Sequence, residues 1–285
     1  MTNYKTLSII IPVYNEAEVI DDCLVSLAKQ SMRDFEIIVV DDGSKDNSIL
    51  KIQKSKSLFK SQNFILLEQD HMGPGAARNL GTRRAGGEIL VFVDADMTFD
   101  KKFLEYLIKP ITSGESKGTF SKFEYVSNWE NTWARCWNIN QNWEEKRRHP
   151  KDYPDKQKVF RAILKKEFDR VGGFTPGGYT DDYSLYEKLG YMAGSAADAI
   201  FYHKNPSHLA EVFSQARWIG KRKYKLGFLG YVIGLLRASF PVSLLVGIFK
   251  SVVYMQPTFI VFKVVYDFGI FLGILELILL RKQVK

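Results

Sequence analysis

The sequence has few cysteines, and neither of them belongs to a C-x-x-C pair. Only Cys23 and Cys136 occur in 285 residues, one in an expected helix and the other among tryptophans. A disulfide framework and a cysteine-based metal site are therefore not indicated. A chain of this length can bury a substantial core without such staples, in one large domain or two coupled halves. The cysteine usage favours a reducing, cytosolic setting.

The sequence also lacks a recognisable targeting segment and any internal repeat or low-complexity tract. Met1–Lys5 leads directly into the apolar run Leu7–Ile11, which is too short for a signal-peptide core, so no secretory signal is expected. Positive charge is in excess, with a formal net charge of +8. This balance suits an anionic partner such as a nucleotide, a phospholipid or a nucleic acid, and charge alone does not choose among them.

A long uncharged apolar run is missing from the C-terminal region. The stretch 226–280 is mostly apolar, but no part of it supplies the ~20 uncharged residues of a clean membrane span. The charged residues that interrupt it are Arg237, Lys250, Lys263, Asp267 and Glu276. The interpretations that remain are a hairpin of two imperfect spans, amphipathic helices lying in the membrane interface, or a soluble oligomerisation surface.

Basic residues flank this C-terminal region on both sides. Lys221, Arg222, Lys223 and Lys225 precede it, and Arg281, Lys282 and Lys285 end it. Positive residues mark the cytoplasmic side of a membrane. Having them at both ends implies an even number of crossings or none, with the chain on the cytoplasmic face of the cell membrane.

Strands and helices alternate in the first third of the chain. The expected order is strand 7–11, helix 18–30, strand 35–40, helix 46–59, strand 64–67, helix 75–85 and strand 89–93. This alternation implies right-handed crossovers and a parallel sheet, and therefore an α/β fold class.

Glycine is absent from the turn where a dinucleotide-binding domain needs it. Such a domain has Gly-x-Gly-x-x-Gly after its first strand, which lets the backbone approach a pyrophosphate. Here the turn is Pro12-Val13-Tyr14-Asn15-Glu16. Nicotinamide and flavin chemistry are therefore disfavoured, and so is a nucleotidyltransferase with a glycine-rich phosphate-binding turn at this position.

Two carboxylates follow the fourth expected strand. Asp94 and Asp96 come directly after the apolar run Ile89–Val93, at the strand end where ligands of parallel sheets bind. The small Ala95 lets the backbone turn, so that both acids can approach one divalent cation together with phosphate oxygens. The alternative is an acidic loop that merely closes the strand.

Six motifs occur in an order that resembles the family 2 glycosyltransferases with the GT-A fold. They are Pro12–Glu16, Val39–Ser44, Ala77–Asn79 with Gly87–Glu88, Asp94–Asp96, Val171–Phe174 followed by Asp181–Asp182, and His203. The resemblance covers roughly residues 5 to 225. It implies a Rossmann-like, mostly parallel sheet flanked by helices, and an inverting transfer of a sugar from a nucleotide-diphosphate donor, UDP rather than GDP.

The resemblance also implies roles for particular residues. Asp42 would accept a hydrogen bond from the nucleobase while Tyr14 packs nearby, and Arg78 would reach the sugar or the diphosphate. The full expected donor site consists of Pro12, Tyr14, Glu16, Asp42, Arg78, Asp94, Gly173, Asp181, Arg217 and Trp218. The structural alternatives are an Asx-type turn at Asp42 and a solvated helix-face arginine at Arg78.

The expected metal ligands are Asp94, Asp96 and His203, which by resemblance would hold Mn²⁺ or Mg²⁺. By the same resemblance Asp182 is the catalytic base, and Asp181 replaces the glutamate that is usual in the family. Acids at this position also complement the dipole of the helix that begins there, with Thr180 as its N-cap.

The motif Gln215-Ala216-Arg217-Trp218 is one residue shorter than the Gln-x-x-Arg-Trp motif of processive synthases. A single transfer is therefore expected rather than polymerisation.

The middle of the chain is expected to bind the acceptor. After the strand-like segment 117–126, Trp129, Trp133 and Trp137 recur every four residues, which predicts three indoles on one helical face. Trp143 and the basic run 146–149 follow. This pattern is typical of a helix lying at a membrane surface, and equally of simple core packing.

Together these patterns predict a nucleotide-sugar-binding half at 1–112, an acceptor-binding and catalytic-base half at 113–225, and a membrane-associated helical region at 226–285. The expected partners are a nucleotide-diphosphate sugar, a lipid-linked acceptor and the membrane, with no nucleic acid. The alternatives are a saccharide acceptor in polysaccharide or cell-surface glycan synthesis, and a non-catalytic membrane-bound protein that has kept the fold.

Overall fold

The computed structural model describes residues 7–59, 63–176, 181–222 and 224–280. Contacts between Cα atoms divide the chain into two compact units, Met1–Tyr125 with Asp152–His203, and Val126–Lys151 with Lys204–Lys285. These units do not follow the predicted divisions at 112 and 225, because Val126–Lys151 packs with the C-terminal helices. Each unit is described by itself below.

The first unit contains an eight-stranded sheet with the strand order β3-β2-β1-β4-β9-β6-β10-β8. The strands are β1 (Leu7–Val13), β2 (Phe35–Asp41), β3 (Phe64–Glu68), β4 (Ile89–Phe92), β6 (Gly118–Phe120), β8 (Lys156–Gln157), β9 (Ala162–Leu164) and β10 (Ala193–Ser195). Neighbours among β3, β2, β1 and β4 are parallel, whereas β9 is antiparallel to both β4 and β6. The predicted α/β class with a mostly parallel sheet is confirmed.

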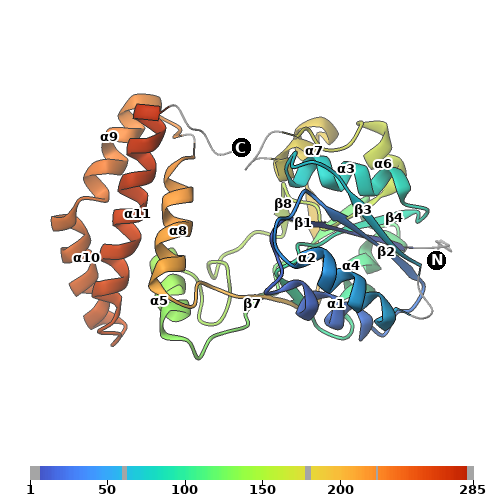
Figure 1. Cartoon of the computed structure of the whole chain (residues 1–285), viewed down its shortest axis with the longest axis horizontal. Coiled ribbons are helices and arrows are strands. Elements are labelled where there is room, and N and C mark those ends of the chain that lie inside the picture. The colour runs from blue at the N-terminus through green and yellow to red at the C-terminus, as the bar shows by residue number, and fades with distance from the viewer. Residues whose placement is uncertain (1–6, 60–62, 177–180, 223, 281–285) are drawn as a thin grey trace. The chain divides into compact units, whose positions relative to one another are not determined.

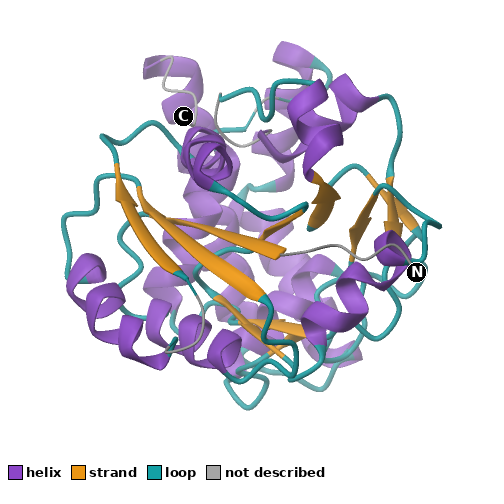
Figure 2. Ribbon diagram, turned by 90° about the vertical axis from the view of Figure 1, so that its right-hand side faces the viewer, coloured by secondary structure: helices purple, strands orange, loops and turns teal. Residues whose placement is uncertain are grey.

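Helices cover both faces of this sheet (Figure 2). Ile9 and Ile11 of β1 join a core with α1 (Ile20–Ala28), α2 (Ser48–Ser55) and α4 (Phe103–Thr112). The intervening Ile10 belongs to the core of the opposite face, with α3 (Pro74–Arg84), α6 (Lys165–Arg170) and α7 (Asp181–Leu189). Alternate side chains of β1 therefore bury against different helix layers, which explains its uninterrupted apolar run.

A second, three-stranded sheet has the order β5-β11-β7. Its strands are β5 (Met97–Phe99), β7 (Glu124–Val126) and β11 (Phe201–His203). The strand-like segment 117–126 therefore contains two strands, and β6 and β7 belong to different sheets.

Pro12 does not end the first strand, contrary to the sequence-based expectation, because β1 continues to Val13. The carbonyl oxygen of Val13 accepts a hydrogen bond from Asp42 N on the β2 side, so the backbone of Pro12 faces the opposite side, toward β4. The β4 pairing stops at Ile10. Proline lacks a backbone N–H, and here none is required.

The second unit is helical and comprises α5 (Thr132–Gln141), α8 (Leu209–Gly220), α9 (Gly227–Arg237), α10 (Phe240–Val253) and α11 (Phe259–Leu280) (Figure 1). Helices α8 and α11 approach closely through glycines. A Cβ atom added at Gly273 would collide with the Arg217 carbonyl oxygen, and one at Gly220 would lie 2.5 Å from the Ile270 carbonyl oxygen. Small residues at such a crossing let two helix backbones touch.

The expectation of three indoles on one helix face is wrong, because Trp129 lies in a turn before the Asn131 N-cap of α5. Trp137 is buried and packs edge-to-face against Phe262 and Tyr266 of α11. The core-packing interpretation therefore holds for Trp137.

None of the helices in the described part of the chain is by itself long and apolar enough to cross a membrane. The pair α9 and α10 meets the length and composition requirement only when taken together, and it is bent by 59° at its break.

Candidate active site

The candidate site lies at the edge of the large sheet where β1, β2 and β4 end. Tyr14 and Glu16 follow β1, Asp42 follows β2, and Asp94 follows β4. Parallel strands bring their carboxyl ends to the same edge. Because β9 runs in the opposite direction, the residue before it, Arg161, comes to this edge as well. Strand direction thus gathers residues that are far apart in sequence.

Asp94 binds two arginines. Its Oδ1 accepts a hydrogen bond from Arg78 Nη2 at 2.7 Å, and its Oδ2 accepts one from Arg161 Nη1 at 2.9 Å. The two arginine side chains are only 6% and 16% exposed. Although burial opposes its ionisation, the guanidiniums of Arg161 and Arg78 hold the pKa of Asp94 well below its usual range. Asp94 is therefore the counter-ion of two nearly buried cations.

Asp96 faces His203. The register of β5 with β11 places Met97 opposite His203, and Asp96 Oδ1 lies 3.3 Å from His203 Nε2. The other ring nitrogen, Nδ1, lies 2.6 Å from Glu124 Oε1. With Nδ1–H donated to Glu124, the Nε2 atom of a neutral ring carries a lone pair toward Asp96, which is the arrangement of a metal-binding histidine with a carboxylate behind it.

The pair Asp96 and His203 fits a divalent cation. Two neighbouring ligands of an octahedral ion, each about 2.1 Å from it, are about 3.0 Å apart, close to the observed 3.3 Å. Both oxygens of Asp94 are already bonded to arginines. Within the described ranges no group of three or more His, Cys, Asp or Glu side chains is arranged around one ion position. Further ligands would therefore come from phosphate oxygens and water.

Glu16 lies in a negatively charged surrounding. Burial, followed by the charges of Asp96, Asp94 and Asp46, raises the pKa of Glu16 from 4.5 to about 7. Glu16, which was predicted to belong to the donor site, is thus a carboxyl group that changes its charge near neutral pH.

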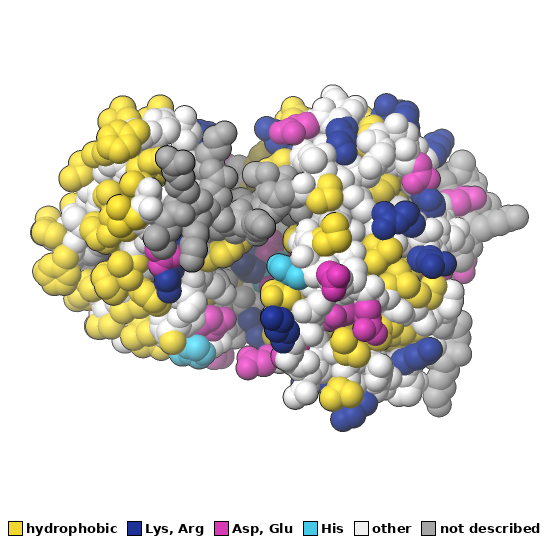
Figure 3. Space-filling view, turned by 45° about the horizontal axis from the view of Figure 1, so that its top comes forward, with side chains coloured by type: hydrophobic (Ala, Val, Ile, Leu, Met, Phe, Trp, Pro, Cys, Tyr) yellow, Lys and Arg dark blue, Asp and Glu magenta, His cyan; other side chains and the backbone are white. Residues whose placement is uncertain are grey.

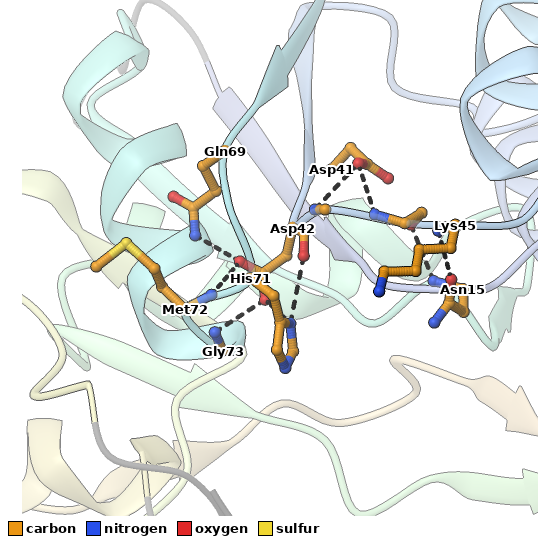
Figure 4. Close-up of polar contacts among 10 residues, drawn as sticks. Asn15, Asp41, Asp42, Lys45, Gln69, His71, Met72 and Gly73 are labelled. Carbon is orange, nitrogen blue, oxygen red and sulfur yellow. Dashed lines mark hydrogen bonds and ion pairs between the residues drawn. The ribbon is translucent and has the colours of Figure 1, made fainter.

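Asp42 is fully engaged by the loop before α3 (Figure 4). Its Oδ1 accepts hydrogen bonds from Gln69 Nε2 at 2.6 Å and from Met72 N at 2.9 Å. Its Oδ2 accepts one from Gly73 N at 2.8 Å and lies 2.9 Å from His71 Nδ1. A carboxylate offers about four acceptor positions. A nucleobase that binds Asp42 would therefore have to replace one of these donors.

The Asx-type turn considered for Asp42 is formed by its neighbour instead. Asp41 Oδ2 accepts hydrogen bonds from Gly43 N at 3.1 Å and Ser44 N at 3.0 Å. The ring of Tyr14 stacks on that of His71, with centroids 3.9 Å apart. Both rings are substantially exposed, so they present a flat aromatic platform beside Asp42.

Gly173 is required by local packing. Its φ is +75°, and a Cβ atom would lie 2.5 Å from Asn79 Oδ1 and 2.9 Å from the Phe168 ring. The Asn79 side chain bonds both backbone groups of Phe174, accepting from N at 2.9 Å and donating to O at 2.8 Å. The glycine loop is thereby fixed to α3, the helix that carries Arg78.

Four of the predicted residues are described apart from the strand-end site. Asp181 and Asp182 form the first turn of α7, as expected, but their side chains and Thr180 lie outside the described residues. Arg217 and Trp218 belong to the helical unit. Arg217 Nε donates to Glu276 Oε1 at 2.6 Å within that unit.

Sequence reasoning missed Arg161, Glu124 and His71. A single cation inside the apolar segment 159–164 was a signal for Arg161, but its meeting with Asp94 depends on the antiparallel pairing of β9 with β4. Nothing in the sequence linked Glu124 to His203, because this contact depends on the second sheet.

Residues 8–176 match the family model "Glycosyl transferase family 2". The match covers more than half of the chain, and the chain therefore belongs to glycosyl transferase family 2, as predicted. The family and the enzyme class are confirmed at this level.

Among similar proteins, the poly(ribitol-phosphate) beta-glucosyltransferase of Bacillus spizizenii is 44% identical over 94 residues, 32% of this chain and 14% of that protein. Glycosyltransferase AglE of Haloferax volcanii is 38% identical over 108 residues, 37% of this chain and 35% of that protein. The matched stretch thus spans well under half of either relative.

Solved structures show the fold. The mannosyltransferase PcManGT of Pyrobaculum calidifontis, in complex with GDP-Man and Mn²⁺, gives a TM-score of 0.61 at 18% identity, covering 98% of this chain and 88% of that one. S. aureus TarS 1-349 gives a TM-score of 0.55 at 20% identity, covering 75% and 64%. The predicted GT-A fold is confirmed.

Replacing Asp94 should destabilise the protein far more than replacing Asp96. Asp94→Asn removes the carboxylate that bonds two nearly buried guanidiniums, and we expect a loss of about 3 kcal/mol in the free energy of unfolding. Asp96 is 48% exposed, so Asp96→Asn should cost less than about 1 kcal/mol. Urea denaturation at pH 7 measures both. Equal losses would contradict the assignment of Asp94 as a structural counter-ion.

Glu16→Gln should stabilise the protein at high pH. The native pKa of about 7 lies above the ordinary value of 4.5, so the native state binds more protons, and the wild type loses stability as pH rises between these values. The variant lacks this loss. After allowance for solvent screening we expect it to be about 1 kcal/mol more stable at pH 8, with the difference shrinking toward pH 4.5. Unfolding in EDTA across this pH range tests the prediction, and a pH-independent difference would refute it.

Proposed function

We propose that this protein transfers one sugar, with inversion, from a nucleoside-diphosphate sugar to an acceptor hydroxyl. One observation carries the proposal: two arginines, Arg78 and Arg161, share a single carboxylate beside the cation-binding pair Asp96 and His203. Two guanidiniums at the sheet edge can donate charge-assisted hydrogen bonds to anionic oxygen atoms. Anionic phosphate oxygens complement such a site.

The departing diphosphate needs charge stabilisation, which is usually the largest contribution of such a site to the rate. Arg78 and Arg161 are positioned by Asp94 to supply part of it. A divalent cation held by Asp96 and His203, Mn²⁺ or Mg²⁺, would neutralise further negative charge on the leaving group. Glu124 orients the His203 ring for this purpose.

Asp182 is proposed as the base. It accepts the proton of the acceptor hydroxyl while the acceptor oxygen forms a bond to the anomeric carbon. The bond from that carbon to the diphosphate oxygen breaks on the opposite face, so the configuration inverts. The position of Asp182 in the first turn of α7, after the glycine loop, supports this role together with the family membership.

UDP is the proposed nucleotide. The rings of Tyr14 and His71 are stacked on each other. Their open face suits a planar nucleobase, because aromatic rings bind one another by stacking. Structures of TarS contain UDP and UDP-GlcNAc, which supports a uridine donor, whereas PcManGT contains GDP-Man. Sugar donors of both nucleotides are therefore compared in the test below.

The proposed acceptor is lipid-linked, at the cytoplasmic face of the membrane. Its support is the apolar surface of α9 and α10, where Phe228, Leu245, Phe249 and Val252 are exposed. Figure 3 shows apolar side chains gathered over the C-terminal helices. Monomeric soluble proteins rarely expose apolar patches of this kind. A saccharide acceptor is the second candidate, because relatives are named as transferases acting on poly(ribitol-phosphate).

The purified full chain should release nucleoside diphosphate from a UDP-sugar when Mn²⁺ or Mg²⁺ is present, and EDTA should abolish this release. UDP-glucose, UDP-GlcNAc and GDP-mannose, each radiolabelled in the sugar, are incubated with membranes containing the protein. Label extracted into organic solvent indicates a lipid acceptor, and label in a water-soluble polymer indicates a saccharide. If no donor binds or turns over, the proposal fails.

Asp182→Asn should lower kcat by about 10²- to 10⁴-fold, because the acceptor proton loses its base. Donor Kd should change less than about threefold, because the proposed base does not contact the nucleotide. Asp169→Asn on α6 is the matched control and should retain activity, since Asp169 is paired on the surface with Lys165. Near-normal turnover of the Asp182→Asn variant would show that Asp182 is not the catalytic base.

A further inference from the structure

The helical unit contains a basic pocket of about 410 Å³. It is lined by the segment before α9, by α9 itself and by α11, all within one compact unit. Four of the lining side chains are cations, Arg222, Lys225, Arg237 and Lys263, and Asp267 is the one acid in the pocket lining. The pocket therefore has an excess of positive charge.

The acid in this pocket is already neutralised. Asp267 Oδ1 lies 2.8 Å from Lys263 Nζ, and Asp267 Oδ2 accepts a hydrogen bond from Ser243 Oγ at 2.7 Å. In the part of the chain that the structure describes, neither Lys225 nor Arg237 forms an ion pair, and both are exposed. Their charges are available to a ligand.

The surface beside the pocket is apolar. On α9 the side chain of Phe228 is 74% exposed, and Leu229 and Leu236 are also exposed. This surface continues along α10, where Phe249 and Val252 are exposed, and Figure 3 shows apolar side chains gathered over the C-terminal helices. A free phosphate ion would gain nothing from such a neighbourhood, whereas an amphiphile with a phosphate head and a hydrocarbon tail complements both parts.

We propose that this pocket binds the phosphate headgroup of an anionic membrane lipid, whose hydrocarbon chain lies along the exposed face of α9. The site lies in a different unit from the sugar-transfer residues and does not depend on transfer, but it rests on the proposed attachment of the protein to a membrane. Both phospholipids and isoprenoid phosphates carry the required head and tail.

The test uses the full chain and sedimentation with vesicles. Vesicles of phosphatidylcholine are compared with phosphatidylcholine containing phosphatidic acid, and with phosphatidylcholine containing an isoprenyl phosphate. The wild type should bind the phosphate-containing vesicles more tightly. Each basic residue near a lipid surface contributes about 1 kcal/mol, so Lys225→Gln/Arg237→Gln should weaken this binding about 30-fold.

The matched control is Lys101→Gln/Lys102→Gln, which removes the same charge from exposed positions outside the helical unit. It should retain the preference to within about threefold. Both double variants replace exposed side chains and should keep the unfolding midpoint and the donor hydrolysis rate of the wild type. A response to phosphatidic acid alone or to isoprenyl phosphate alone identifies which lipid phosphate the site takes.

Four outcomes overturn the proposal. Equal weakening in both double variants means that only overall charge matters. Equal binding to neutral and anionic vesicles would refute the headgroup site but not the attachment to membranes. Tight binding of inorganic phosphate, at the affinity of the lipid, would make the pocket a small-anion site. No binding to any vesicle, with donor hydrolysis intact, refutes membrane attachment and the headgroup site without affecting the proposed sugar transfer.

Discussion

The bridge from Asp94 to Arg78 and Arg161 is the interaction on which the candidate site depends. One carboxylate compensates two nearly buried guanidiniums that arrive from α3 and from the start of β9. Without it, the two cations would repel each other in a poorly solvated place. With it, they are held at the sheet edge where parallel strands present their ligands.

The neighbouring carboxyl groups differ in how strongly they hold a proton. Asp94 is held ionised by its arginines, whereas burial together with Asp96 and Asp94 raises the pKa of Glu16 to about 7. Asp96, partly exposed and facing His203, is left to meet a cation. Three carboxyl groups at one sheet edge thus have three different environments. A site whose acids differ in proton affinity in this way can hold one carboxylate ionised while another changes its charge near neutral pH.

The strand–helix alternation and the order of motifs were predictable, because period and turn chemistry are local properties of the sequence. Roles that depend on strand pairing were not. Asp94 was expected beside Asp96 on one ion, and its contact with Arg161, which depends on the antiparallel pairing of β9 with β4, was not foreseen. Glu124 became visible as the partner of His203 only through the second sheet. Trp137 matched its helical pattern, whereas Trp129 fell before the N-cap that Asn131 provides.

Four of the five charges that interrupt the apolar C-terminal region are explained by contacts within the helical unit. Lys250 donates to the Ile139 carbonyl and to Asn142, Lys263 pairs with Asp267, and Glu276 pairs with Arg217 and Lys221. Helix α11 packs its glycine face against α8, so much of its apolar surface is covered by another helix of the same unit. Most of the apolar surface that remains exposed is on α9 and α10, and Arg237 lies beside it with no ion pair in the described ranges. An uncompensated cation beside exposed apolar helix faces is the combination that supports the proposed lipid site, because a core-filling surface would be covered by other side chains.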